Sequence, residues 1–415
     1  MNQNNIEKIT NSYLCTGCGG CGFICRQKAI SVIENLSGYL IACIDHAKCN
    51  NCGLCLKVCP QNNYSFCNSI GDFFIGNVID TYIGYASDNI IRKLGQSGGV
   101  VTSLLCYLLD SQKIEAAIIN KFDPNTSNTS VIFTSNREEL IASAGSYYVQ
   151  SAVLEKINSL NKTAIVTLGC QSQALKNINN LGYGTPEYII GLICAGNYSR
   201  DYISAIAKER DKIKSITEFR FRDKRTNGWP GNIFIKYKDN KTVILPAKHR
   251  HKLKQVYECH HCLACFDQMN IMADIVVGDP WGINLDDKEK NDGVSVIIIR
   301  TNKGAELINN AIEKGYIITT KIKSDIIFKG QTVETRQKNK IYAAKLWMKK
   351  NKYIYPGILD KFELKHIPIK LKFDIYQRLR YTRKILNIKK RKYINLYRNL
   401  YYCFLNILKV INLIS

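Results

Sequence analysis

Eight cysteines near the N-terminus have a spacing that few kinds of chemistry use. They form two runs of the pattern C-x2-C-x2-C-x3-C, and Pro60 follows the second run directly. The two runs consist of Cys15, Cys18, Cys21, Cys25, Cys49, Cys52, Cys55 and Cys59. A cubane 4Fe–4S cluster needs four thiolates, and two-residue gaps in a loop place three of them around one cluster. The spacing therefore predicts two 4Fe–4S clusters.

The same pattern predicts how the two clusters share their ligands. Each cluster takes three cysteines of one run and the last cysteine of the other. The first set is thus Cys15, Cys18, Cys21 and Cys59, and the second set is Cys49, Cys52, Cys55 and Cys25. Zinc is the alternative metal, but two identical runs suit four-cysteine zinc sites poorly. Residues 1–68 resemble a bacterial two-cluster ferredoxin, although Arg26 stands where such proteins usually have proline.

The composition favours a folded metalloprotein. Of the 415 residues, 46% are hydrophobic and 22% are charged, which suffices for two or three domains with cores. Seventeen cysteines are many for a reducing compartment unless they bind metal. Residues 1–13 do not read as a signal peptide, and no uncharged apolar run reaches the roughly 18 residues of a spanning helix. We expect a cytoplasmic protein in which Cys43 and Cys67 are ordinary buried thiols.

Positive charge is concentrated in residues 341–415. The formal net charge is +24, and from Ile375 to the end there are ten Lys or Arg residues and no acidic residue. Leu, Ile and Tyr alternate with these cations, which predicts a basic tail of amphipathic helices. Such helices could lie at the inner face of a membrane, dock on a partner protein or complete the fold. Nucleic-acid binding is not expected, because no reading module accompanies the charge.

After residue 69, short apolar runs alternate with helical patterns, which predicts an α/β layer. We expect a helix over residues 100–109 and strands over 78–85, 116–120, 163–168, 188–193, 274–277 and 294–300. Gly95–Gly99 (GQSGG) precedes the helix. Bare N–H groups at a helix N-terminus can bind an anion. The glycines could equally serve only a turn, so both interpretations stay open.

Five further cysteines suggest another metal site. They are Cys170, Cys194, Cys259, Cys262 and Cys265. The first two each follow a predicted strand, where α/β sheets build their sites, and the last three lie in a His-rich turn. Four of the five could bind a third cluster, with Cys262 and Cys265 as a C-x2-C pair. Separate buried thiols with a zinc site that uses a neighbouring histidine are the alternative.

Six stretches, in order, resemble the beta-subunit family of coenzyme F-420 hydrogenases and dehydrogenases. They are Gly95–Thr102, Gly145–Ser151, Gly169–Leu175, Leu192–Gly196, Phe219–Trp229 and Cys262–Gly282. The resemblance covers roughly residues 75 to 320 and implies an N-terminal region at 75–160 and a C-terminal domain at 161–325. It also implies an iron–sulfur flavoprotein that binds FAD. Relatives include ferredoxin-linked oxidoreductases and bacterial proteins associated with surface polysaccharide synthesis.

The resemblance also implies roles for individual residues. The residues implied to contact the flavin are Gln96, Ser97, Gly98 and Gly99. The residues implied to bind a third 4Fe–4S cluster are Cys170, Cys194, Cys262 and Cys265. Cys259 then becomes an extra thiol. Arg220 and Arg222 could hold flavin phosphates or an acidic substrate, or lie on an ordinary exposed strand. Tyr147 and Ala195 depart from the lysine and histidine frequent in the family, so neither the substrate nor the use of coenzyme F-420 can be inherited.

These patterns combine into one expected protein. Its fold class is an α+β ferredoxin-like N-terminal domain, an α/β (Rossmann-like, mixed-sheet) flavin domain and a helical basic tail. Clusters carry single electrons and a flavin can collect two, so we expect an oxidoreductase that links ferredoxin or another redox protein to an unidentified small organic substrate. A non-catalytic electron-transfer subunit is the first alternative. A membrane-surface protein of polysaccharide synthesis is the second.

Overall fold

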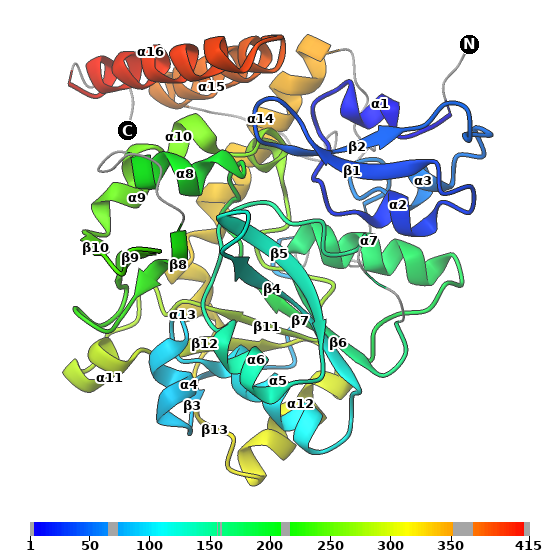
Figure 1. Cartoon of the computed structure of the whole chain (residues 1–415). Helices are drawn as coiled ribbons and strands as arrows, with labels where there is room; N and C mark the ends of the chain where they lie inside the picture. Colours follow the sequence, from blue (N-terminus) through cyan, green and yellow to red (C-terminus); the bar gives the residue numbers. More distant parts are fainter. Residues whose placement is uncertain are drawn as a thin grey trace.

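The computed structural model describes residues 4–64, 74–155, 157, 160–208, 216–351 and 368–410. A large mixed sheet forms the body, and a small cysteine-rich module, a second sheet and two C-terminal helices pack around it (Figure 1). The fold is thus a mixed α/β fold with an N-terminal ferredoxin-like module, as the sequence predicts.

The N-terminal module is built from very short elements. They are α1 (Glu7–Thr10), α2 (Gly20–Ile24), β1 (Ile30–Glu34), β2 (Leu40–Ile44) and α3 (Leu54–Val58). The two strands form an antiparallel hairpin in which Ile30 pairs with Ile44. Helix α2 packs against α7 (Gly169–Asn180) of the body, where a Cβ added at Gly20 would lie 3.3 Å from the Cβ of Ala174. The close approach of the two helices therefore favours a residue without a side chain.

The main sheet has eight strands in the order β13-β3-β12-β11-β7-β6-β4-β5. Their bounds are β3 Asp80–Ala86, β4 Ala116–Asp123, β5 Asn128–Thr134, β6 Thr163–Thr167, β7 Tyr188–Leu192, β11 Ile275–Gly278, β12 Ser295–Ile299 and β13 Ile317–Lys321. The four central strands β4, β6, β7 and β11 run parallel, and the other pairings are antiparallel. The carboxyl ends of the parallel strands therefore meet at one edge.

Strand β12 shows why this sheet is covered on both faces. All five of its residues are buried, and successive side chains of a strand point to opposite faces. Val296 and Ile298 join the core under α7 and the N-terminal module, whereas Ile297 and Ile299 join the core of the opposite face. That face carries α4 (Asn89–Leu94), α5 (Val100–Asp110), α6 (Arg137–Ala142) and α12 (Asn302–Glu313).

A second, three-stranded sheet lies beside the main one. It contains β8 (Ile216–Asp223), β9 (Asn232–Tyr237) and β10 (Thr242–Leu245), all antiparallel. The remaining elements of the body are α8 (Asp201–Lys208), α9 (Lys248–Lys252), α10 (Lys254–Tyr257), the 3-10 helix η1 (His260–Ala264), α11 (Asp287–Asp292), α13 (Ser324–Gly330) and α14 (Val333–Asn351). Phe219 and Phe221 of β8 pack in a separate core with Val149, Tyr202 and Ile233.

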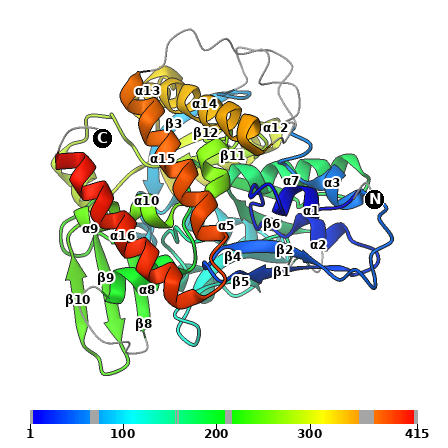
Figure 2. The ribbon, with the colours of Figure 1, turned by 90° about the horizontal axis from the view of Figure 1, so that it is seen from above.

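The C-terminal helices α15 (Ile369–Leu386) and α16 (Arg391–Val410) lie together across one side of the molecule (Figure 2). The buried guanidinium of Arg398 holds α16 in place. It donates to Asp201 Oδ2 (2.7 Å) and to the carbonyl of Ser37 (2.6 Å), and its Cζ lies 4.4 Å from the centroid of the Tyr257 ring. The helix thus joins the N-terminal module to the body. Among the described residues, no helix is long and apolar enough to cross a membrane.

The expected strands and helix of the body all occur, with ends shifted by no more than a few residues. The sequence analysis did not predict β5, β13, β9 and β10, because these strands are amphipathic and their apolar runs are short. Strand β8 corresponds to the strand that was the alternative interpretation of Arg220 and Arg222. Cys43 was expected to be buried and is exposed, because it lies on the outward face of β2. Cys67 lies outside the described residues.

Candidate functional site

The first predicted cluster set comes together in the N-terminal module. Burial raises the pKa of Cys21 well above its ordinary value, and repulsion from Cys15, Cys18 and Cys59, and least from Cys55 of the second set, adds to this. The four thiols are therefore close neighbours. The Ala42 N–H donates to Cys15 Sγ at 3.4 Å, a contact typical of the sulfurs around a cluster.

Glycines allow the backbone to fold around this set. Gly19 precedes α2 with a φ of 91°, in the left-handed region that side chains rarely adopt. A Cβ at this position would lie 2.4 Å from the backbone nitrogen of Glu155. The loop therefore needs glycine both for its own turn and for its approach to the body.

The second set lies nearer the surface. Burial raises the pKa of Cys55 to about 11, with repulsion from Cys52 and Cys49 contributing. Cys52 is exposed and Cys49 is half-buried. Cys25, the fourth predicted member, accepts the Ala29 N–H at 3.3 Å, and its place in this set remains a prediction from the spacing.

The third set is assembled from three distant segments. Cys170 begins α7, Cys194 follows β7, and Cys262 and Cys265 lie in and just after η1. All four line one small cavity of about 30 Å³, together with Thr16 of the N-terminal module. Burial raises the pKa of Cys194 to about 12. Cys259 is fully buried and does not line this cavity. This agrees with the sequence interpretation, in which Cys259 is an extra thiol and not a ligand.

The donor set of each group suits an iron–sulfur cluster. Each contains four cysteines, and thiolates are the ligands such clusters require. His261 also lines the cavity of the third set, with its Nε2 3.3 Å from Cys262 Sγ. In the part of the chain that the structure describes, no three His, Cys, Asp or Glu side chains converge on a single metal ion. The four sulfurs of a single zinc site all lie about 2.3 Å from one ion. A cubane binds its four cysteines at separate corners, so the cysteine sulfurs lie farther from one another than in a zinc site.

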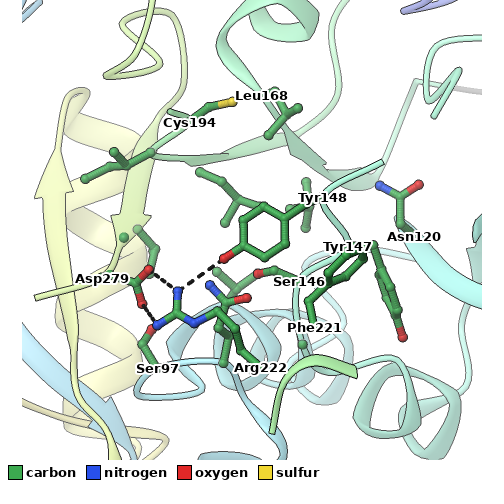
Figure 3. A pocket seen from close by; sticks show the side chains of 18 of the residues that line it. Ser97, Asn120, Ser146, Tyr147, Tyr148, Leu168, Cys194, Phe221, Arg222 and Asp279 are labelled. Carbon is green, nitrogen blue, oxygen red and sulfur yellow. Dashed lines mark hydrogen bonds and ion pairs between the residues drawn. The ribbon is translucent and has the colours of Figure 1, made fainter. Parts of the chain in front are cut away.

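A larger cavity of about 380 Å³, here called the main cavity, opens at the carboxyl ends of the parallel strands. Leu168, Cys194 and Asp279 line it, and each lies within two residues of the end of one of these strands (Figure 3). Ligands in α/β folds bind at this edge. Cys194 also lines the small cavity of the third set, so the two sites share a wall.

The GQSGG segment forms a second wall of the main cavity. Gly99 precedes α5 with no capping side chain, so the N–H groups of the first turn have no partner within the helix. These residues, Val100–Thr102, line the cavity. The Gly98 N–H donates to Ser295 Oγ (2.9 Å), and a Cβ on Gly98 would lie 2.6 Å from the Gly84 carbonyl oxygen. The segment is thus held against β3 and β12 with its helix start open to the cavity.

Two polar atoms of the cavity wall fit the edge of an aromatic heterocycle. Gln96 Oε1 and Asn120 Oδ1 are buried and accept no hydrogen bond within the described structure. Unpaired buried acceptors are costly, so a bound ligand that donates to them would stabilise the site. Apolar side chains such as Val166 and Ile193 supply flat surface nearby. The residues therefore fit a flavin.

The structure separates the two arginines that the sequence grouped. Arg222 lines the main cavity, where its guanidinium forms two hydrogen bonds with the Asp279 carboxylate and one with Tyr148 Oη (3.1 Å; Figure 3). Arg220 does not line the cavity. It bonds to Glu218 and to the carbonyls of Leu94 and Ala144, and so ties together two loops of the cavity wall.

Three cations that sequence reasoning missed form what we call the cationic wall. They are Arg250 of α9, Lys254 of α10 and Arg336 of α14, and all three line the main cavity. Within the described residues, none of them forms an ion pair with a carboxylate. Burial lowers the pKa of Lys254. The basic run KHRHKLK at residues 248–254 contains two of these cations. Its pattern did not indicate a binding site, because it is also typical of a solvated surface.

The positions that depart from the resembled family also lie here. Tyr147 and Ala195 line the main cavity. Differences at these positions therefore alter the walls of the site.

Comparison with family models gives three matches. Residues 14–63 match a 4Fe-4S dicluster domain. Residues 81–158 and 160–325 match the N-terminal and C-terminal parts of the coenzyme F420 hydrogenase/dehydrogenase beta subunit.

Two curated proteins illustrate the relatives. The chain is 29% identical over 336 residues to the coenzyme F420-dependent sulfite reductase of Methanocaldococcus jannaschii, which covers 75% of this chain and 48% of that protein. It is 27% identical over 257 residues to the coenzyme F420 hydrogenase subunit beta of Methanococcus voltae, covering 60% of this chain and 86% of that subunit. The matched region is thus about half the length of the sulfite reductase. These relatives do not support a link to polysaccharide synthesis.

A solved structure shares the fold. It is a chain of the F420-reducing NiFe hydrogenase complex from Methanosarcina barkeri, with a TM-score of 0.52 and 20% sequence identity. The match covers 66% of this chain and 93% of that chain. At this identity the likeness concerns the arrangement of the elements alone.

Proposed function

Because the chain belongs to the coenzyme F420 hydrogenase/dehydrogenase beta-subunit family, we propose that it is an iron–sulfur flavoprotein oxidoreductase. It relays electrons between a redox protein partner and a small organic substrate bound in the main cavity. The route runs from the second cysteine set through the first and third sets to the cavity.

The shared wall of the two cavities carries this proposal. Cys194 lines both the small cysteine cavity and the main cavity. On its other side, the small cavity includes Thr16, which lies between Cys15 and Cys18 of the first set. Repulsion from Cys18 contributes to the raised pKa of Cys170, after burial and the effect of Cys265. A cluster held by the third set would thus stand between the N-terminal module and the cavity.

The main cavity is proposed to hold FAD. The start of α5 would face a phosphate, and Gln96 and Asn120 would accept hydrogen bonds from the flavin ring. When bound, FAD supplies the conversion between single electrons and electron pairs. Arg220 keeps the walls together through its bonds to Leu94 and Ala144, and Arg222 is fixed by Asp279.

The cationic wall favours an anionic substrate. Among the described residues that line the cavity, Asp279 is the one carboxylate, and it already pairs with Arg222. Glu258 lies near Lys254 and Arg336 but pairs with Arg378. A phosphate or carboxylate on the substrate would supply the missing negative charge. Coenzyme F420, which the names of the relatives give, is the first substrate to test.

A second function is an electron-transfer subunit whose substrate is handled by a partner. The Methanococcus voltae relative is named as a subunit, and the sulfite reductase is about twice as long as the region matched here. The exposed Cys52 marks the side on which a partner would approach the second cluster. In this case the chain would carry clusters and flavin but would not turn over substrate alone.

Anaerobic reconstitution tests the proposal. We expect about twelve irons per chain, one FAD, and reduction of F420 by the dithionite-reduced protein. Cys170→Ser should remove about four irons and the flavin-to-cluster electron transfer, whereas Cys403→Ser, at an exposed position on α16, should change neither. Full iron and flavin without turnover would favour the subunit function. Protein without flavin under saturating FAD would exclude the flavoprotein proposal.

A further inference from the structure

Helix α16 carries an exposed apolar stripe next to the apolar face that it packs against the protein. Its inner face packs against the protein through buried residues, namely Ile394, Tyr401, Leu405 and Leu408. Its outer face carries large apolar residues that are between 38% and 60% exposed, namely Tyr393, Leu396, Leu400, Phe404 and Ile407. Their spacing of three or four residues places these five on one stripe of the helix. We call this stripe the outer face of α16.

Asparagines border this face on the side away from the inner face. Asn395, Asn399 and Asn406 are exposed and follow their own row along the same helix. The outer face is therefore an exposed apolar stripe with a polar border on one side, and on its other side it continues through Tyr397 into the inner face. A helix that only completed the fold would need no large apolar residues there.

Lysines rim the outer face. Lys392 Nζ lies 5.0 Å from the centroid of the Tyr393 ring, and Lys384 Nζ of α15 lies 5.1 Å from that of Tyr397. Long lysine side chains can lie along apolar surface while their charge stays in a polar layer. Residues 368–410 contain twelve Lys or Arg and one acidic residue, Asp374.

Most of this charge is free to meet an external anion. Arg378, Arg391 and Arg398 form ion pairs with carboxylates of the protein. The other nine cations of this segment form none with the residues that the structure describes. The layer formed by α15 and α16 therefore combines an exposed apolar stripe with uncompensated positive charge.

We propose that the outer face of α16 binds the surface of a membrane that contains anionic lipids. Leu, Phe and Tyr would enter the boundary between headgroups and acyl chains, and the rim lysines would contact lipid phosphates. Because Arg398 fixes the inner face to Asp201 and Ser37, the helix would remain docked and lie parallel to the membrane. A second copy of this chain is a poorer occupant, since the two cationic rims would repel each other.

The exposed side of this layer matches that orientation. Figure 2 looks down on α15 and α16, which lie in front of the other elements in this view. The two helices therefore form a layer at the surface of the molecule, where the outer face is exposed.

Two matched triple variants of the full-length, cluster-loaded protein test the proposal. The first is Leu396→Glu with Leu400→Glu and Ile407→Glu, and the second is Asn395→Glu with Asn399→Glu and Asn406→Glu. Both add the same negative charge to exposed positions of α16. Binding is measured by flotation with phosphatidylcholine vesicles that contain or lack phosphatidylglycerol.

We expect the unchanged protein to float with phosphatidylglycerol vesicles and not with pure phosphatidylcholine. The leucine–isoleucine variant should bind at least about tenfold more weakly than the asparagine variant, because only it removes apolar insertion. Equal binding by the two variants would overturn the proposal, and so would an unchanged protein that ignores anionic vesicles. Sedimentation that shows a dimer, dissolved only by the first variant, would instead assign the face to a second copy.

Iron and flavin content, measured for every variant, keep this test separate from the proposed redox function. Should the first variant lose iron, Leu396→Ser with Leu400→Ser provides a milder version with the same expected direction. Flotation does not depend on turnover, so the two proposals can fail independently.

Discussion

The N-terminal module and the third cysteine set would hold the same kind of cluster in opposite ways. The module has helices of four or five residues and one two-stranded hairpin, with eight cysteines threaded through them. The third set is placed by α7, β7 and η1 of a body that has a core of its own on one face of the main sheet and shares a second core with the module on the other face. We therefore expect the module to depend on its clusters for its fold more strongly than the body does.

The strongest test of this comparison is removal of a cluster ligand from each region. Cys21→Ser should abolish the first cluster and unfold the module, because metal-binding free energy is folding free energy in so small a unit. Cys170→Ser should remove only the third cluster. Limited proteolysis with iron analysis checks this: cleavage should begin within residues 4–64 in the first variant alone. Equal resistance of both variants would show that the module has sufficient stability of its own.

The next effect concerns the contact that joins the two regions. Arg398→Met should lower the free energy of unfolding by about 3 to 5 kcal/mol, because Asp201 would keep only its partly exposed partner Arg391. Denaturant titration measures the change. Lys409→Met, on the exposed side of the same helix, is the control and should change it by less than about 0.5 kcal/mol. A similar loss in both variants would assign the effect to the helix as a whole.

A smaller effect is expected in the main cavity. Lys254→Met and Arg336→Met should each raise the KM for an anionic substrate about tenfold and leave iron content unchanged, since each removes one charge-assisted contact. Steady-state kinetics with F420 measures this. Lys248→Met, exposed on α9 and away from the cavity wall, should leave KM unchanged. A KM that falls or stays constant in all three variants would contradict an anionic substrate.

The smallest effect should come from a buried lysine beside the GQSGG segment. Lys224 Nζ donates to the carbonyls of Arg92 (2.7 Å), Asp292 (2.7 Å) and Ser97. Burial, with repulsion from Arg92 and Arg222, lowers its pKa to about 7; Asp292 and Asp279 act in the opposite direction. The unfolded chain then binds one more proton than the folded one above pH 7, so stability attributable to this group rises with pH.

This predicts a gain of about 1 kcal/mol between pH 7 and pH 8 relative to Lys224→Met. Unfolding titrations of both proteins at the two pH values measure the difference, and the other titrating groups cancel in the comparison. A constant difference across this range would show that the three carbonyls keep the ammonium protonated.

The comparison also explains what the sequence could predict. Cysteine ligands of the module are close together in the chain, so spacing alone indicates which thiols meet. To predict the third set, two signals were needed. Apolar runs locate the ends of the strands before Cys170 and Cys194, and a family resemblance indicates which cysteines act together. Pairing of Arg222 with Asp279 joins residues 57 positions apart. No local pattern encodes such a pair.

The cationic wall shows the limit of local patterns more clearly. Arg250 and Lys254 belong to a basic run that looks like a solvated surface, and Arg336 lies on a helix of mixed composition. Only the packing of α9, α10 and α14 around one cavity gives them a common role. Conversely, Arg220 matched a motif of the resembled family but serves the loops behind the cavity wall.

The bond between Ser37 and Arg398 has a consequence for the order of assembly. These residues lie 361 positions apart, with one near each end of the chain. During synthesis the N-terminal segment emerges long before α16 exists. While most of the polypeptide is made, the segment with the first two cysteine sets therefore lacks its hydrogen bond to Arg398. Iron can then reach these cysteines before α16 packs against its neighbours.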